Sequence, residues 1–202
     1  MLDAALIEKC ADPSLPPAIV ERFVEAAGSS DPLAITVKSG GRLILVPKPK
    51  TPDEAMEIIR ANLGRAVVRV GLTQFPAGVG VTDASELKAD LVDPCENLRM
   101  GTRMFSRIMR IVAKWYGNPT DSEVQPQIFE DAVHSWKTGE FEGVGVFQAE
   151  DPGTDWKAPD EARKTENAEP ADGVTGEQDE RPVEADTGSA GIRIDLSRIN
   201  GK

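Results

Sequence analysis

Residues whose types could carry nucleophilic, redox or metal chemistry are few in this chain: two cysteines, Cys10 and Cys95, and one histidine, His134. A structural zinc site needs four ligands, which these three residues cannot supply. Two interpretations of the cysteines remain open, either two buried free thiols or one disulfide formed in an oxidising compartment. His134 falls near the end of a predicted helix, where a surface or capping role is the simpler interpretation. The sequence therefore predicts no metal and no cofactor.

Five basic residues repeat along one predicted helix at spacings of four, four, three and four: Arg99, Arg103, Arg107, Arg110 and Lys114. This spacing places them in one stripe on a single helix face. A solvated face is the simplest interpretation, and the alternatives are an anionic partner or a dock for the chain's own acidic segment. Nucleic acid is not expected as that partner, because no binding motif or interleaved aromatic residue accompanies the stripe.

The elements that position these residues follow from hydrophobic periodicity and capping signals. Helices are predicted over residues 16–27, 51–63, 94–115 and about 126–137. Residues 34–37 and 42–46 flank a Lys-Ser-Gly-Gly turn and predict a hairpin, while the apolar run 67–75 fits a strand or the start of a helix. The residues of the long helix expected to face the core are Leu98, Met104, Phe105, Ile108, Ile111, Val112 and Trp115.

The formal net charge of −11 is concentrated in one segment. Residues 150–186 hold 13 Asp and Glu against 4 Lys and Arg, whereas residues 1–149 carry only −4. Because the acidic segment has many Pro and Gly and few large apolar residues, it cannot bury enough surface to offset its ordering entropy. We expect a folded domain at 1–149, a disordered acidic linker at 150–190, and a short strand-like segment at 191–202.

The last segment alternates apolar and polar residues, which is a strand pattern. It could add to the sheet edge of another protein or remain a frayed end, and both interpretations stay open. No stretch of eighteen or more uncharged apolar residues predicts a membrane span. Residues 1–9 lack the basic start and long apolar core of a signal peptide.

Four segments carry motifs in a fixed order along about 130 residues. They are Cys10-Ala11-Asp12-Pro13-Ser14-Leu15 with Asp31-Pro32-Leu33-Ala34-Ile35, Gly71-Leu72-Thr73-Gln74-Phe75-Pro76, Asp93-Pro94-Cys95-Glu96-Asn97-Leu98-Arg99 with Gly101, and Ala132-Val133-His134-Ser135-Trp136-Lys137-Thr138-Gly139. Together they resemble the specialised lytic transglycosylases of conjugation and type IV secretion systems. Within that group, the chain resembles the TraH conjugal-transfer proteins.

This resemblance implies a mainly α, lysozyme-like fold of the goose-lysozyme type with a small β-hairpin, followed by the acidic tail. It also implies that Cys10 and Cys95 pair, which favours the disulfide, and that the protein works in the periplasm or cell envelope. The absence of a signal peptide in residues 1–9 points instead to the cytosol, and that alternative stays open. The implied partners are other proteins of the conjugation apparatus and the glycan strands of peptidoglycan.

The resemblance also implies a reaction, cleavage of glycan strands by one Glu that acts first as an acid and then as a base. Such a carboxyl needs a raised pKa to hold its proton at neutral pH. The family places this Glu five residues before Pro32, where this chain has Ala27. The nearest acid, Glu25, lies about 200° further round the helix and is expected to point away. The sequence therefore predicts a non-catalytic protein of the transfer apparatus; the alternative is an active transglycosylase that uses Glu25.

Other departures from the motifs agree with this prediction. Pro76 stands where the family has an Asn that would line the groove, and Trp136-Lys137 replaces a Tyr-Asn pair. Gln74, Trp136 and Thr138 remain candidates for binding a substrate, although closing the core is the simpler role for them. A cytosolic nucleic-acid accessory factor is the third hypothesis, and it rests on the basic stripe alone.

Overall fold

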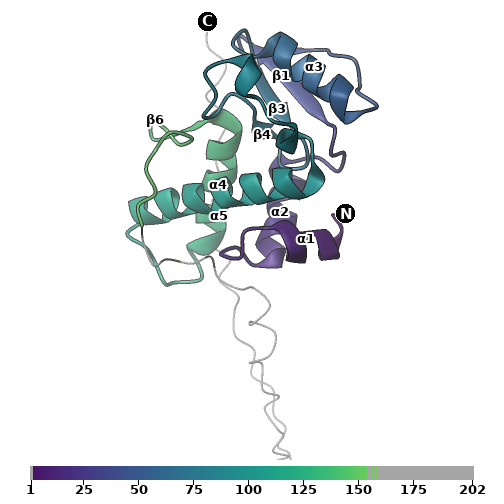
Figure 1. Cartoon of the computed structure of the whole chain (residues 1–202). Coiled ribbons are helices and arrows are strands. Elements are labelled where there is room, and N and C mark those ends of the chain that lie inside the picture. Colours follow the sequence, from purple (N-terminus) through teal and green to yellow (C-terminus); the bar gives the residue numbers. More distant parts are fainter. Residues whose placement is uncertain (1, 154–155, 157, 159–202) are drawn as a thin grey trace, which may run out of the picture. The chain divides into compact units, whose positions relative to one another are not determined.

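Helix α4 (Pro94–Trp115) crosses the centre of the computed structural model, which describes residues 2–153, 156 and 158 (Figure 1). Asp93 caps its start by accepting a hydrogen bond from the Glu96 amide, and proline occupies the first helical position. Helix α5 (Gln125–Thr138) packs along α4, and α1 (Ala4–Cys10) also contacts α4. Helix α2 (Pro17–Ala27) packs against both α1 and α5, so four helices enclose one core.

The helices begin and end close to where capping signals predict. Helix α2 ends at Ala27, directly before Gly28, and α3 (Pro52–Asn62) is capped by Thr51, whose side chain accepts from the Glu54 amide. The long helix has the predicted bounds, and α5 differs from its prediction by one residue at each end. Helix α1 was not predicted, although Asp3 caps it by accepting from the Ala5 amide.

A four-stranded antiparallel sheet lies on one side of α4, with the strand order β2-β1-β3-β4. Its strands are β1 (Ile35–Ser39), β2 (Arg42–Ile44), β3 (Val67–Val70) and β4 (Phe75–Pro76). The predicted hairpin is confirmed, and positive φ angles of 55° and 77° at Gly40 and Gly41 suit its two-residue turn. The apolar run from residue 67 is a strand only as far as Val70.

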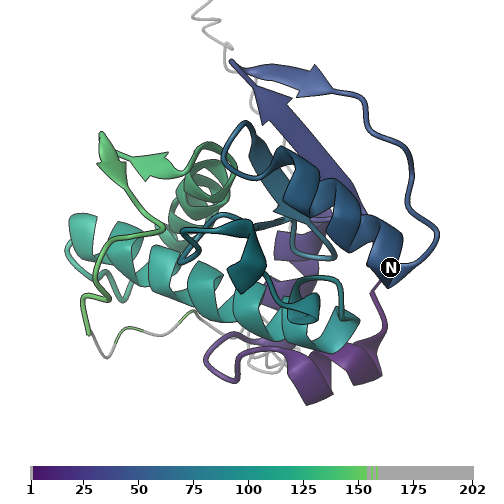
Figure 2. The same cartoon turned by 45° about the horizontal axis from the view of Figure 1, so that its top comes forward.

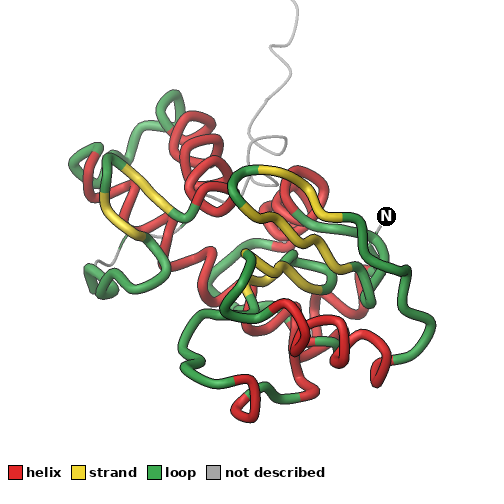
Figure 3. Tube along the Cα trace, turned by 90° about the horizontal axis from the view of Figure 1, so that it is seen from above, coloured by secondary structure: helices red, strands yellow, loops and turns green. Residues whose placement is uncertain are grey.

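The two faces of this sheet have different surroundings. Helix α3 packs against β1 and β3 and covers one face of the sheet (Figure 2). Val37 and Val70 are fully buried on this face. Direct pairing of Lys38 with both Leu43 and Val67 places these three side chains in one row on the opposite face. We call this second face the open face. Strands β5 (Glu140–Phe141) and β6 (Val144–Gly145) form a separate small sheet (Figure 3).

Aromatic rings fill the core where the helices meet. Trp136 has 0% exposed surface, and its ring lies edge-on to Phe23 with centroids 5.1 Å apart. Phe23 stacks on Phe105 at 3.9 Å. The prediction that Trp115 faces inward is wrong, because it is 59% exposed at the last residue of α4, while Met109, which was not expected, is buried.

Five α-helices and small antiparallel sheets make the described part a mixed α/β structure dominated by helix. Its contacts continue past residue 149, because the Trp156 indole donates to the Pro119 carbonyl and Ala158 is only 8% exposed. The remainder of the predicted linker and the strand-like segment at 191–202 lie outside the described residues. None of the described helices is long and apolar enough to cross a membrane.

Candidate functional site

A groove of about 1000 Å³ lies beside the open face of the sheet. The tip of the β1–β2 hairpin, the connection from α3 into β3, the segment after β4, and the end of α5 with Phe147 and Gln148 line it. We refer to this feature as the groove. A cavity of this size between a sheet and a helix end is large enough for a polymer segment or a peptide.

Arg69 on β3 is the most buried charge among the groove residues. Its Nη2 donates to the carbonyls of Trp136 (2.6 Å) and Lys137 (3.1 Å), and its Nη1 donates to the Gln74 carbonyl (3.2 Å). Burial lowers the pKa of Arg69 to about 10, so the side chain still carries its charge at neutral pH. Arg69 therefore ties the sheet to the end of α5 and gives the groove a positive floor.

Sequence reasoning did not single out Arg69. The available signal was a single arginine inside the apolar run Val67-Val68-Arg69-Val70. A charge that is partly buried within an apolar strand requires hydrogen-bond partners, and here they are main-chain carbonyls. None of the ion pairs found among the described residues joins Arg69 to a carboxylate.

Three further cations and two acids line the groove: Lys38, Arg65, Lys137, Asp83 and Glu140. Asp83 accepts a hydrogen bond from the Ser85 amide, and hydrogen bonds from Ser85 lower the pKa of this carboxyl. A carboxyl whose pKa is lowered is ionised at neutral pH and cannot serve as a proton donor there. The lining is thus cationic in sum, and Asp83 is unsuited to acid catalysis.

The end of α2, where the resemblance places a catalytic Glu, carries no acid. Ala27 is its last residue, and Glu25 is exposed on the helix; neither lines the groove. The chain turns directly into a close contact after Ala27, since the Ser29 amide donates to the Leu72 carbonyl at 2.8 Å. A Cβ at Gly28 would lie 2.1 Å from the same oxygen, so only glycine fits there.

The three predicted substrate-binding residues separate into two groups. Thr138 is exposed and lines the groove, whereas Gln74 and Trp136 are buried and do not. In the Gln74 side chain, Oε1 accepts from Thr36 Oγ1 at 2.6 Å and Nε2 donates to the Gly71 carbonyl at 3.1 Å. The Trp136 indole donates to the Thr73 carbonyl at 3.1 Å. The side chains of Gln74 and Trp136 therefore close the core, and Pro76 lines the groove in place of an amide.

Asn97 holds the turn between β3 and β4 and was not proposed as a site residue. Its fully buried amide accepts from the Thr73 amide at 3.0 Å and donates to the carbonyls of Val70 and Leu91. Gly71, with φ of 74°, lies so close that a Cβ there would be 2.4 Å from Asn97 Nδ2. The asparagine of the third motif thus has a structural role in positioning the second motif.

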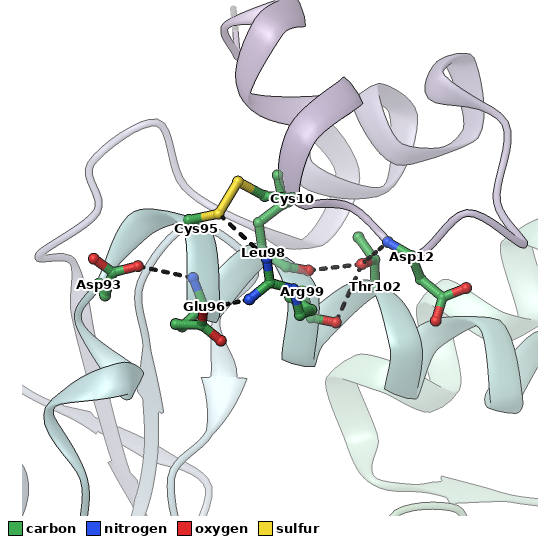
Figure 4. Close-up of a disulfide and its surroundings, with 8 residues drawn as sticks. All are labelled: Cys10, Asp12, Asp93, Cys95, Glu96, Leu98, Arg99 and Thr102. Carbon is green, nitrogen blue, oxygen red and sulfur yellow. Dashed lines mark hydrogen bonds and ion pairs between the residues drawn. A yellow bond between two sulfur atoms is a disulfide. The ribbon is translucent and has the colours of Figure 1, made fainter.

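Cys10 and Cys95 form a disulfide with their Cα atoms 5.2 Å apart (Figure 4). The bond joins the end of α1 to the first turn of α4. Two helical turns further along α4, Thr102 Oγ1 accepts from the Asp12 amide at 2.8 Å (Figure 4). Of the two interpretations left open for the cysteines, the structure has the disulfide.

His134 is exposed and lines a smaller pocket of about 350 Å³ beside Asp131 and Glu142.

The basic stripe on α4 is only partly solvated. Arg107 Nη2 donates to the Phe147 carbonyl at 2.8 Å, and Arg110 forms an ion pair with Asp151, with Nε donating to Oδ1 at 2.9 Å. The segment around 147–151 therefore covers the middle of the stripe, while Arg99, Arg103 and Lys114 stay exposed. The interpretation of the stripe as a solvated face is therefore wrong at Arg107 and Arg110. Asp151 lies in the acidic segment, so Arg110 agrees with the alternative that the chain's own acidic segment docks on the stripe.

The Arg110–Asp151 pair predicts a pH-dependent contribution to stability. The hydrogen bond from Arg110 holds the pKa of Asp151 below its ordinary value, so the contribution is present at neutral pH and is lost as the pH falls through that lowered pKa. For a partly exposed pair, Asp151→Asn is expected to lower the free energy of unfolding by about 0.5–1 kcal/mol at pH 7. The difference should shrink at an acidic pH below that lowered pKa, because a protonated Asp151 is uncharged like the asparagine that replaces it.

Urea unfolding at the two pH values measures this difference. Glu150→Gln, which removes the neighbouring exposed charge, is the matched control and should change stability little at either pH. A loss of equal size at both pH values for Asp151→Asn would contradict the ion-pair explanation.

No group of three or more His, Cys, Asp or Glu in the described part of the chain is arranged to hold a metal ion.

In comparison with known proteins, the family model TraH_2 matches residues 1–201. The "Uncharacterized protein y4dP" of Sinorhizobium fredii (strain NBRC 101917 / NGR234) is 62% identical over 202 residues, which is the full length of both chains. No solved structure gives a significant match.

Proposed function

Because the chain belongs to the TraH_2 family, we propose that it is a non-catalytic component of a plasmid conjugal-transfer apparatus. Its groove serves binding or assembly, on a scaffold related to the lysozyme-like transglycosylases. The placement of the motifs supports this relationship. Parts of the second and fourth motifs line the groove through Pro76 and Lys137–Gly139, and the disulfide joins the first motif to the third.

The observation that carries the non-catalytic part is the missing proton donor at the end of α2. Cleavage of a glycosidic bond at neutral pH needs a carboxyl that keeps its proton until the leaving oxygen takes it. Ala27 offers a methyl group at that position. Of the two acids that do line the groove, Asp83 is held in its ionised form by hydrogen bonds from Ser85.

Glu25 gives the rival hypothesis of an active enzyme little support from the geometry. Its side chain is exposed on α2 and is not among the residues lining the groove. Use of Glu25 would require α2 to shift by two residues against the close contact between Gly28 and the Leu72 carbonyl. The nucleic-acid hypothesis is weakened as well, because the middle of the basic stripe is covered by residues of the same chain.

A location in the cell envelope is part of the proposal. The disulfide between Cys10 and Cys95 supports it, because disulfides persist in oxidising compartments such as the bacterial periplasm. The resemblance described above also implies that the protein works in the periplasm or cell envelope, so the two arguments agree.

Plasmid transfer from donor cells tests the role directly. Deletion of the gene is expected to lower the transfer frequency, and both the wild-type chain and Glu25→Gln should restore it fully, because no carboxyl of α2 takes part in chemistry. Immunoblots would establish equal protein levels. Unchanged transfer after deletion would contradict the proposed role. Failure of Glu25→Gln to restore transfer, at normal protein level, would favour the active enzyme.

A further inference from the structure

Large apolar side chains on the sheet remain uncovered in the described structure. Leu43 is 60% exposed, Leu45 is 90% exposed and Val67 is 56% exposed. Leu43 and Val67 each pair directly with Lys38, so they belong to the open face, and Leu45 follows directly after the edge strand β2. Leu43 and Val67 thus flank Lys38 in one row of the sheet, and exposed apolar side chains beside a groove are typical of a surface that binds a partner.

Cations adjoin these apolar residues within the groove. Lys38, Arg65, Arg69 and Lys137 line it, against Asp83 and Glu140. This positive lining contrasts with the charge of −4 over residues 1–149. A locally positive cavity in an acidic protein attracts anionic groups of a ligand.

We propose that the groove and the open face together bind an acidic polypeptide segment that also carries apolar side chains, on a partner protein of the transfer apparatus. The inference rests on the proposed function, and it names the class of ligand that the groove binds. Carboxylates of the segment pair with Lys38, Arg65 and Lys137 at the groove. Its apolar side chains cover Leu43 and Val67.

Two other ligand classes fit this surface less well. Single-stranded nucleic acid needs free aromatic faces on which bases stack. Phe147 is the single aromatic residue of the lining, and the Arg69 guanidinium lies over its ring at 5.6 Å. An uncharged glycan would leave the cations of the lining without partners. The acidic polypeptide uses both the charges and the exposed leucine.

Fluorescence anisotropy with defined peptides tests the proposal on the full chain. The probe is a labelled, end-blocked peptide of alternating Leu and Glu, compared with Leu–Lys and Ser–Glu peptides of the same length and with labelled oligothymidine. Leu–Glu should bind, more weakly at high salt. Ser–Glu should bind about tenfold more weakly, because it lacks the apolar contacts. Leu–Lys should not bind.

Paired charge reversals locate the site and control for net charge. Lys38→Glu/Lys137→Glu is expected to weaken binding of Leu–Glu about tenfold, whereas Lys88→Glu/Lys114→Glu changes the net charge equally outside the groove and should have little effect. Leu43→Ser should weaken binding, and Val144→Ser, which alters an equally exposed residue on β6 outside the open face, should not.

Three outcomes would overturn the inference: no binding of Leu–Glu, equal weakening by both double variants, or oligothymidine binding that depends on Lys38 and Lys137. These results are separable from the proposed function. If deletion abolishes transfer but the peptide does not bind, the inference fails and the role in transfer stands. If the peptide binds but peptidoglycan is cleaved, the non-catalytic role fails instead.

Discussion

Removal of the disulfide is expected to lower the free energy of unfolding by about 4 kcal/mol. Cys10 and Cys95 are separated by 85 positions, so the bond closes a long loop and restricts the unfolded chain strongly. It also connects α1 covalently to the start of α4. Helix α1 has few contacts with elements other than α2 and α4. Unfolding in urea, followed by far-ultraviolet circular dichroism, should show the loss for Cys10→Ala/Cys95→Ala.

Chemical reduction provides the matched comparison for that variant. Adding a thiol reductant should shift the wild-type unfolding curve toward that of Cys10→Ala/Cys95→Ala and leave the variant's own curve unchanged. Coincident curves for oxidised and reduced wild-type protein would show that the bond does not stabilise the native state.

Truncation of Trp136 is expected to have an effect of similar size. Trp136→Ala should lower the free energy of unfolding by about 3–5 kcal/mol, the usual cost of emptying a large aromatic site in a core. The side chain is fully buried against Phe23, Phe75, Phe105 and Phe147, and its indole nitrogen satisfies the Thr73 carbonyl. The cavity left behind could not collapse without moving α2 or α4.

Trp115→Ala is the control for this prediction, because it removes the same side chain from a site that is 59% exposed. It should change the free energy of unfolding by less than about 1 kcal/mol. If both variants lose the same stability, the assignment of Trp136 to the core and Trp115 to the surface is wrong.

The helices and the hairpin could be predicted from the sequence because their signals are local. Thr51, Asp93 and Gly28 act within a few residues of the helix ends that they mark. Trp115 was misplaced because helical periodicity assigns a face but not the length over which neighbours cover it. Pairing of Arg110 with the acidic segment was one of the alternatives left open, but the sequence could not single it out, since Asp151 lies 41 residues away in a segment expected to be unstructured.

The candidate site was predictable to a smaller extent. Motif spacing drew attention to the segments around Gln74 and Trp136, but it could not distinguish side chains that line a groove from those that support it. Two structural facts depend on long-range contacts that no local pattern encodes: Gln74 turns inward to Thr36, and Arg69 spans from the sheet to the end of α5. The sequence alone contained Ala27 in place of an acid, which remains the basis of the non-catalytic proposal.

Release of anhydro-muropeptides from purified peptidoglycan measures most directly whether the protein cleaves glycan strands. The purified, disulfide-bonded chain would be incubated with sacculi, and the soluble products identified by chromatography and mass spectrometry beside an active lytic transglycosylase. The missing carboxyl at Ala27 predicts no release above that of the buffer control, for the wild-type chain and for Glu25→Gln alike. Release by the wild-type chain that Glu25→Gln abolishes would contradict this prediction and establish a working enzyme.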